Sequence, residues 1–189
     1  MALSYLRRVI IHRLKAISNC QLCNAVKSRH NNARETAKVL AAAYLSNTTV
    51  DTIVCMEETE VIGTFLAEQL ADENQYSLSK GNNISIITPE MYQDGQILFR
   101  DNKQRMVENK QVLILAASIT TGKSVKQAIE SVLYYGGRVC GISAISVQST
   151  RLQEWKSIRS SQAVIFRITE HILRKIARSA EKDSGSKLS

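Results

Sequence analysis

The chain has 189 residues, a formal net charge of +8, one Pro and eight Gly. This length suits one domain with a sizeable core, and the scarcity of Pro and Gly excludes a long linker. No apolar run is long enough to cross a membrane, and four Cys do not form a secreted disulfide framework in a chain this long. We therefore expect a single cytoplasmic domain over residues 1–180, with no membrane partner and a disordered polar tail over 181–189.

The charge is unevenly spread along the chain. Residues 1–34 carry Lys and Arg but no acid, whereas residues 51–79 carry Asp and Glu but no base. The basic residues are not interleaved with aromatic ones, as a nucleic-acid surface would favour, so a nucleic-acid partner is not expected. A basic surface that serves anionic small molecules or a contact between subunits fits this pattern better.

The first third of the chain shows helical spacing on both sides of one short strand. Apolar residues in the first 17 positions recur at helical intervals. Asn32 and Glu35 resemble a capping box that opens a second helix. This helix would turn one face to the core, with Ala37, Leu40, Ala41 and Tyr44 on it. A continuous apolar strand over 52–56 and a helix that contains Ile62, Leu66 and Leu70 follow.

From residue 84 onwards, apolar strands alternate with polar stretches and helices. Strands are predicted over 84–88, 97–99, 112–115, 139–147 and 163–166, a polar stretch over 100–111, a helix from Gly122 to Gly136, and a last helix around 172–177. Strands that are continuously apolar and alternate with helices predict a parallel sheet covered on both faces. Ligands of such sheets bind beyond the carboxyl ends of the strands, where the loops 57–60 and 116–124 lie.

The strongest functional signal is the passage from the strand 112–115 through Thr120-Thr121-Gly122 into a helix. The first backbone N–H groups of a helix lack partners and the helix dipole favours an anion, so this turn is suited to a phosphate. A structural interpretation is also open, in which Ala116-Ala117-Ser118 is a tightly packed strand end before an ordinary helix start.

The same residues nearly match the P-loop of nucleoside triphosphatases. In Ala117-x-x-x-x-Gly122-Lys123-Ser124, Lys123 would hold the terminal phosphates and Ser124 would hold Mg²⁺. A P-loop enzyme also needs an Asp at the end of a neighbouring strand, and the strand 139–147 ends in Gln148 instead.

Three blocks together resemble the type I phosphoribosyltransferases, and within them the orotate-type members. They are the segment 50–57 with the helix behind it, the motif strand and loop 112–125, and the helix and strand 126–145. The resemblance implies a three-layer α/β fold with a central parallel sheet of about five strands flanked by helices. It also implies a small hood built from residues 1–30 and 148–168, and a homodimer.

The resemblance further implies a substrate and the residues that bind it. The substrate would be phosphoribosyl pyrophosphate (PRPP) or a nucleoside 5′-monophosphate, Mg²⁺ could accompany PRPP, and no other cofactor and no protein-bound metal site are expected. Its phosphate would be bound by Ser118, Thr120, Thr121, Gly122, Lys123 and Ser124. Glu57, Glu58 and Thr59 would form the pyrophosphate loop, and Arg100 and Lys103 would belong to a basic catalytic loop that covers the pyrophosphate.

The sequence departs from the family pattern beside the phosphate loop. Ala116 and Ala117 stand where the family has two adjacent acids that bind the ribose hydroxyls. Two functions therefore stay open: transfer of phosphoribosyl to a nucleobase such as orotate, or binding of a phosphorylated metabolite without turnover.

The spacing Cys20-x-x-Cys23 also leaves two interpretations open. It could be a redox pair or half of a zinc site, for which His12 and His30 are the only nearby further ligands, or it could be two small residues at the edge of a helix.

Overall fold

A central parallel sheet organises the protein. The computed structural model describes residues 26–27, 29–46, 48–72, 77–92, 96–147 and 164–167. The sheet strands are β1 (Thr52–Cys55), β2 (Ser85–Ile87), β5 (Gln111–Ile119), β6 (Arg138–Val147) and β7 (Val164–Arg167). They lie in the order β2-β1-β5-β6-β7, and all four pairings are parallel. The predicted five-stranded parallel sheet is confirmed.

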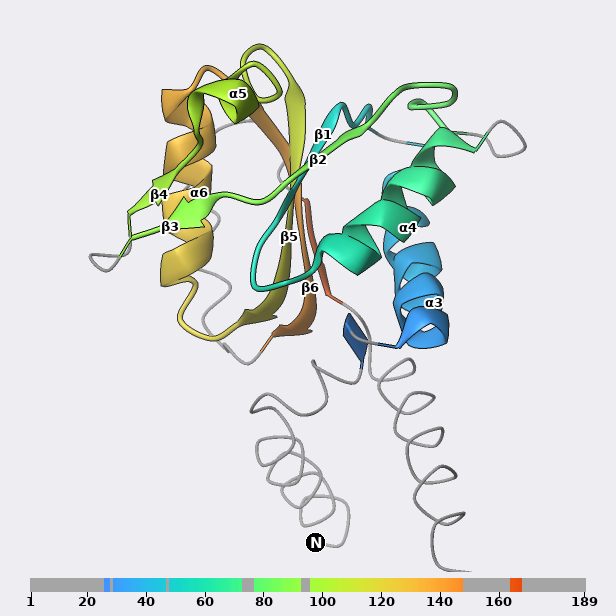
Figure 1. Ribbon diagram of the computed structural model, residues 1–189. Helices are drawn as coiled ribbons and strands as arrows, with labels where there is room; N and C mark the ends of the chain where they lie inside the picture. Colours follow the sequence, from blue (N-terminus) through green and yellow to red (C-terminus); the bar gives the residue numbers. More distant parts are fainter. Residues whose placement is uncertain are drawn as a thin grey trace, which may run out of the picture.

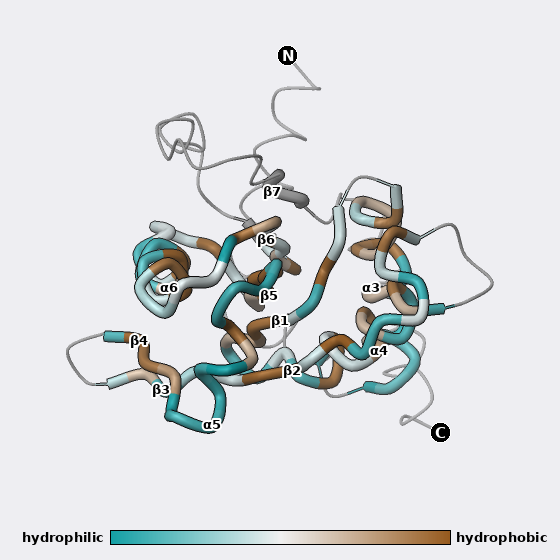
Figure 2. Tube along the Cα trace, turned by 90° about the horizontal axis from the view of Figure 1, so that it is seen from above, coloured by the Kyte–Doolittle hydropathy of each residue, from teal (hydrophilic) through white to brown (hydrophobic). Residues whose placement is uncertain are grey.

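Helices cover both faces of the sheet and make three layers (Figure 1). The helices α3 (His30–Ala41) and α4 (Glu60–Ala71) pack on one face, and α6 (Lys123–Tyr134) packs on the other. Figure 2 shows the sheet between these layers, with the apolar side of α6 turned toward it. Apolar side chains at helical spacing bury this side of α6: Val125, Ala128, Ile129 and Val132. Two buried apolar clusters, one on each face, form the core.

Strand β5 is four residues longer than predicted at its carboxyl end. The prediction ended the strand at Leu115, but β5 continues to Ile119. It continues because Ala116, Ser118 and Ile119 pair in register with the long neighbouring strand β6. The turn between β5 and α6 is therefore short and consists of residues 120–122.

The start of α3 also differs from its prediction. The helix begins at His30, two residues before the expected cap, so Asn32 lies within it. The N–H of Ala33 already donates to the carbonyl of Arg29 across 2.9 Å, and no side chain of the described residues caps this end. The predicted inner face is correct, because Ala37, Leu40, Ala41 and Tyr44 are all buried.

Residues 90–104 contain two elements that apolar periodicity did not reveal. A two-stranded antiparallel ribbon joins β3 (Glu90–Met91) to β4 (Ile97–Leu98), and the short helix α5 (Asp101–Gln104) follows. Only β4 matches a predicted strand. The two missed elements, β3 and α5, are too short to show an apolar period.

Parts of the predicted hood lie within the described residues. The strand β7 comes from the segment 148–168, and it pairs with β6 at the edge of the main sheet. The other residues of 148–168, the first and last predicted helices, the tail 181–189, and Cys20 and Cys23 lie outside the described residues. The hood therefore stays a prediction. Among the residues that the structure describes, no helix is long and apolar enough to span a bilayer.

Candidate functional site

Two turns lie side by side at the carboxyl edge of the sheet. Strands β1 and β5 are parallel neighbours, with Cys55 opposite Leu115. One step further, the N–H of Met56 donates to the carbonyl of Leu115 across 2.8 Å. The acidic turn, residues 57–59, therefore follows β1 directly beside the end of β5, and the threonine turn, residues 120–122, follows β5.

The threonine turn is open. Thr120 and Thr121 are exposed, and Gly122 has φ of 77°, a left-handed conformation that Gly adopts without strain. Among the described residues, no acceptor is paired with the backbone N–H of residues 120–122, and the N–H of Lys123 has only a long contact, 3.4 Å, to the Thr121 hydroxyl. The turn leads into α6, whose 12 residues place the positive end of the helix dipole here. This geometry suits an anion.

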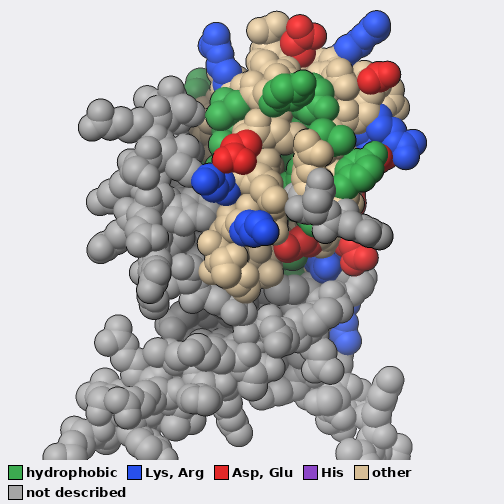
Figure 3. Space-filling model, turned by 90° about the vertical axis from the view of Figure 1, so that its left-hand side faces the viewer, with side chains coloured by type: hydrophobic (Ala, Val, Ile, Leu, Met, Phe, Trp, Pro, Cys, Tyr) green, Lys and Arg blue, Asp and Glu red, His purple; other side chains and the backbone are tan. Residues whose placement is uncertain are grey.

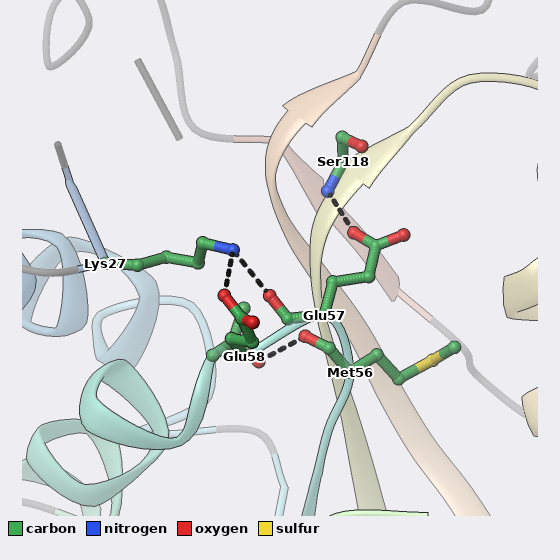
Figure 4. A network of polar contacts seen from close by, with 6 residues as sticks. Lys27, Met56, Glu57, Glu58 and Ser118 are labelled. Carbon is green, nitrogen blue, oxygen red and sulfur yellow. Dashed lines mark hydrogen bonds and ion pairs between the residues drawn. The ribbon is translucent and has the colours of Figure 1, made fainter. Parts of the chain in front are cut away.

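The acidic turn is strained and firmly held. Glu57 and Glu58 have φ of 56° and 62°, a region that side chains other than Gly rarely adopt. The Lys27 ammonium donates to the Glu57 carbonyl across 2.8 Å and lies 3.4 Å from the Glu58 carboxylate (Figure 4). The Thr59 hydroxyl is buried within hydrogen-bond distance of two carbonyls, those of Met56 at 2.9 Å and Leu115 at 3.1 Å. These contacts fix the backbone of the turn.

A hydrogen bond connects the acidic turn to the end of β5. The backbone N–H of Ser118 donates to Oε2 of Glu57 across 3.0 Å (Figure 4). Both residues belong to the predicted site, but neither their contact nor the part of Lys27 was predicted. A signal was present: Glu57 comes directly after the predicted strand 52–56, and parallel neighbours bring their carboxyl ends to the same edge of a sheet.

The two alanines of the motif lie in the core. Ala116 packs in the apolar cluster on the α6 face, and Ala117 packs in the cluster on the α3 and α4 face. Both are almost fully buried, because successive side chains of a strand point to opposite faces and helices cover both faces of this sheet. These two positions therefore offer no polar side chain to a ligand.

Arg100 and Lys103 lie apart from the threonine turn. Figure 1 places α5 at the end of the sheet where β5 begins, opposite that turn. The Arg100 guanidinium pairs with the Glu90 carboxylate, and the Lys103 ammonium donates to the Thr88 carbonyl across 2.7 Å. Their predicted catalytic role stays a prediction.

The described residues contain no reactive thiol and no group of three side chains that could hold a metal ion. Burial raises the pKa of Cys55 to about 12, and the charge of Glu60 adds to this shift. Burial likewise raises the pKa of Cys140 to about 12. Both thiols are therefore protonated at neutral pH and lie in the core rather than at the candidate site.

Several solved structures are similar to this chain. No family model matches the chain, and neither does any curated protein. A purine phosphoribosyltransferase from Pyrococcus horikoshii is 17% identical with a TM-score of 0.39, and the match covers 73% of this chain and 82% of that one. For a hypoxanthine phosphoribosyltransferase from Trypanosoma cruzi, the identity is 13%, the TM-score 0.45 and the coverage 77% of both chains.

A longer protein also matches. UMP synthase from Leishmania donovani is 16% identical with a TM-score of 0.48, and the match covers 90% of this chain but only 32% of that one. At such low identity the function has to be argued from the residues. The parallel sheet with helices on both faces is the architecture that the resemblance to type I phosphoribosyltransferases implies.

Proposed function

We propose that the threonine turn binds the phosphate group of a phosphoribosyl compound, either PRPP or a nucleoside 5′-monophosphate. The observation that carries this proposal is the open turn before α6, on the carboxyl edge of a parallel sheet. It has exposed Thr hydroxyls, and the backbone N–H groups of residues 120–122 have no acceptor among the described residues. The binding residues are Ser118, Thr120, Thr121, Gly122, Lys123 and Ser124. The protein would act in the cytoplasm.

The acidic turn would meet the pyrophosphate of PRPP. Two carboxylates beside an anion repel it unless a cation intervenes. Mg²⁺ is commonly bound by one or two carboxylates together with the phosphates of the ligand, and Glu57 and Glu58 can supply that number. The metal would therefore come with PRPP rather than reside in the protein. Arg100 and Lys103 could cover the pyrophosphate only if the segment around α5 approached the threonine turn.

The proposed reaction is transfer of phosphoribosyl to a nucleobase, orotate first. The alternative is binding of a phosphorylated metabolite without turnover. The burial of Ala116 and Ala117 favours this alternative, because no side chain there can bind the ribose hydroxyls as the family acids do.

The exposed side of α6 and of the ribbon is where a second copy would fit. Figure 3 shows hydrophobic side chains among charged and other ones on this side of the molecule. Tyr134, in α6, is 82% exposed, and Met91, in the ribbon, is 54% exposed. A homodimer that buried them would accord with the family resemblance.

The test joins turnover to binding. Pyrophosphate release is measured with PRPP, Mg²⁺ and a panel of nucleobases, and calorimetry measures the affinity for ribose 5-phosphate. The transfer reaction predicts release with at least one base, and the alternative predicts release with none. We also expect the double variant Thr121→Ala/Ser124→Ala to bind ribose 5-phosphate about tenfold or more weakly, since it loses two hydroxyl contacts to a charged group.

The exposed Thr49, in the loop before β1, provides a matched control. Thr49→Ala should bind like the wild type. Binding without release with any base would leave only the non-catalytic alternative, and an affinity that the double variant does not change would overturn the phosphate site itself.

A further inference from the structure

The carboxylate of Glu57 has an unusual place for an acid, because it lies beside a turn suited to anions. Its Oε2 accepts from the Ser118 N–H, one residue from the last residue of β5. Among the contacts between described residues, none involves Oε1, and Figure 4 shows this second oxygen pointing away from Ser118. Glu57 is exposed, so Oε1 is accessible to a ligand.

The position of this carboxylate is fixed by its surroundings. Lys27 holds the Glu57 carbonyl, and the side chain of Lys27 is itself only 13% exposed. The Thr59 hydroxyl lies within hydrogen-bond distance of the Met56 carbonyl, after β1, and of the Leu115 carbonyl, in β5. With both its backbone and one oxygen bound, the carboxylate loses less freedom when a ligand arrives than an ordinary surface Glu would.

The two turns together present opposite kinds of groups. The threonine turn offers N–H and O–H donors, which favour a phosphate, whereas Oε1 of Glu57 offers only an acceptor with a negative charge. A bare phosphate ion gains from the first and is repelled by the second. A phosphate ester that also carries hydroxyl groups can satisfy both, because a hydroxyl donates a charge-assisted hydrogen bond to a carboxylate.

We propose that Glu57 is a specificity-determining residue, which makes the threonine turn select phosphate esters of a hydroxyl-bearing sugar over inorganic phosphate. This inference rests on the proposed phosphate site and adds the residue that chooses among its ligands. The selection works in both directions, since the same carboxylate attracts the hydroxyl and repels the free anion.

The experiment compares two ligands in three proteins. Calorimetry with ribose 5-phosphate and with inorganic phosphate, in EDTA to exclude divalent metals, is carried out on the wild type, Glu57→Gln and Glu68→Gln. Glutamine keeps the size of the side chain and an oxygen for the Ser118 N–H but removes the charge. Glu68→Gln removes the same charge from an exposed carboxylate within α4, outside both turns.

In the wild type we expect ribose 5-phosphate to bind about tenfold or more tightly than inorganic phosphate. Glu57→Gln should reduce this ratio about tenfold, by weakening the ester and strengthening the free ion. Glu68→Gln should leave the ratio within about twofold, because a charge outside both turns acts on the two ligands alike. Thermal unfolding of the three proteins checks that each is folded.

Two results would overturn the inference while leaving the phosphate site intact. One is a ratio that Glu57→Gln does not change. The other is an equal gain for both ligands, which would make Glu57 a source of repulsion only. If the wild type binds neither ligand, the proposed function fails and the inference fails with it.

Discussion

The two turns at the carboxyl edge of the sheet make the same kind of connection with different backbone conformations. Each joins a buried parallel strand to a helix of 12 residues. The threonine turn places its only positive φ at Gly122, whereas the acidic turn places positive φ at two glutamates. Strained residues of this kind persist where surrounding contacts over-determine them, and such sites are often functional. The acidic turn is thus a rigid support for a carboxylate, and the threonine turn is an open site beside it.

The packing of α4, the helix that follows the acidic turn, against β1 can be disrupted by a single substitution. Gly63, in the first turn of α4, lies against β1, where a Cβ would come 2.4 Å from Sγ of Cys55. Gly63→Ala should therefore lower the free energy of unfolding by roughly 2–3 kcal/mol, as overpacking in a tight core does. Urea denaturation measures this loss.

A second change separates steric conflict from other effects. In Cys55→Ala the sulfur is gone, so adding Gly63→Ala to this background should cost much less than it costs alone. If the two changes are additive, the close approach of α4 to β1 is not what limits position 63.

The architecture was predictable because its signals are local or periodic. The apolar runs around Ile53, Ile114 and Ile142 predicted buried parallel strands, and each lies in the core of the sheet. The turn at Gly122 and the helix end at Gly136 were predictable from local signals too, because Gly is favoured where the backbone needs a positive φ.

The relations between the two turns were not predictable in the same way. The hydrogen bond between Glu57 and Ser118 joins residues 61 positions apart, and the contact of Lys27 with Glu57 spans 30 positions. A periodicity argument places such residues on elements but does not say which side chain reaches which backbone group. The length of β5 was missed for a related reason, because its last residues depend on pairing with β6 rather than on their own propensity.

The buried thiol of Cys55, in the strand before the acidic turn, makes the stability of the protein depend on pH in alkaline solution. Its pKa is raised from 9.0 to about 12 in the folded protein, so the unfolded chain loses this proton first as the pH rises. The stability that the buried thiol contributes is complete below pH 9 and is lost as the pH rises toward 12. Between pH 8 and pH 10.5 the wild type should therefore lose about 2 kcal/mol more stability than Cys55→Ala does.

Chemical denaturation of both proteins at several pH values measures this difference. Cys140 and Tyr44, whose pKa values are also raised by burial, remain in both proteins and cancel in the comparison. Parallel stability curves for the two proteins would contradict the burial of the Cys55 thiol.

The smallest expected effect bears most directly on the strain in the acidic turn. At Glu58 the φ of 62° costs an L-residue about 1 kcal/mol relative to Gly. Glu58→Gly should therefore be more stable than Glu58→Ala by roughly 0.5–1 kcal/mol, after the greater freedom of Gly in the unfolded chain is subtracted. The exposed Glu68, within α4, supplies the control, because there Ala should be more stable than Gly by about 1 kcal/mol. The two sites should thus rank Gly and Ala in opposite orders in urea denaturation. The same order at both would mean that the turn is relaxed, and that only its side-chain contacts hold the carboxylate of Glu57 against β5.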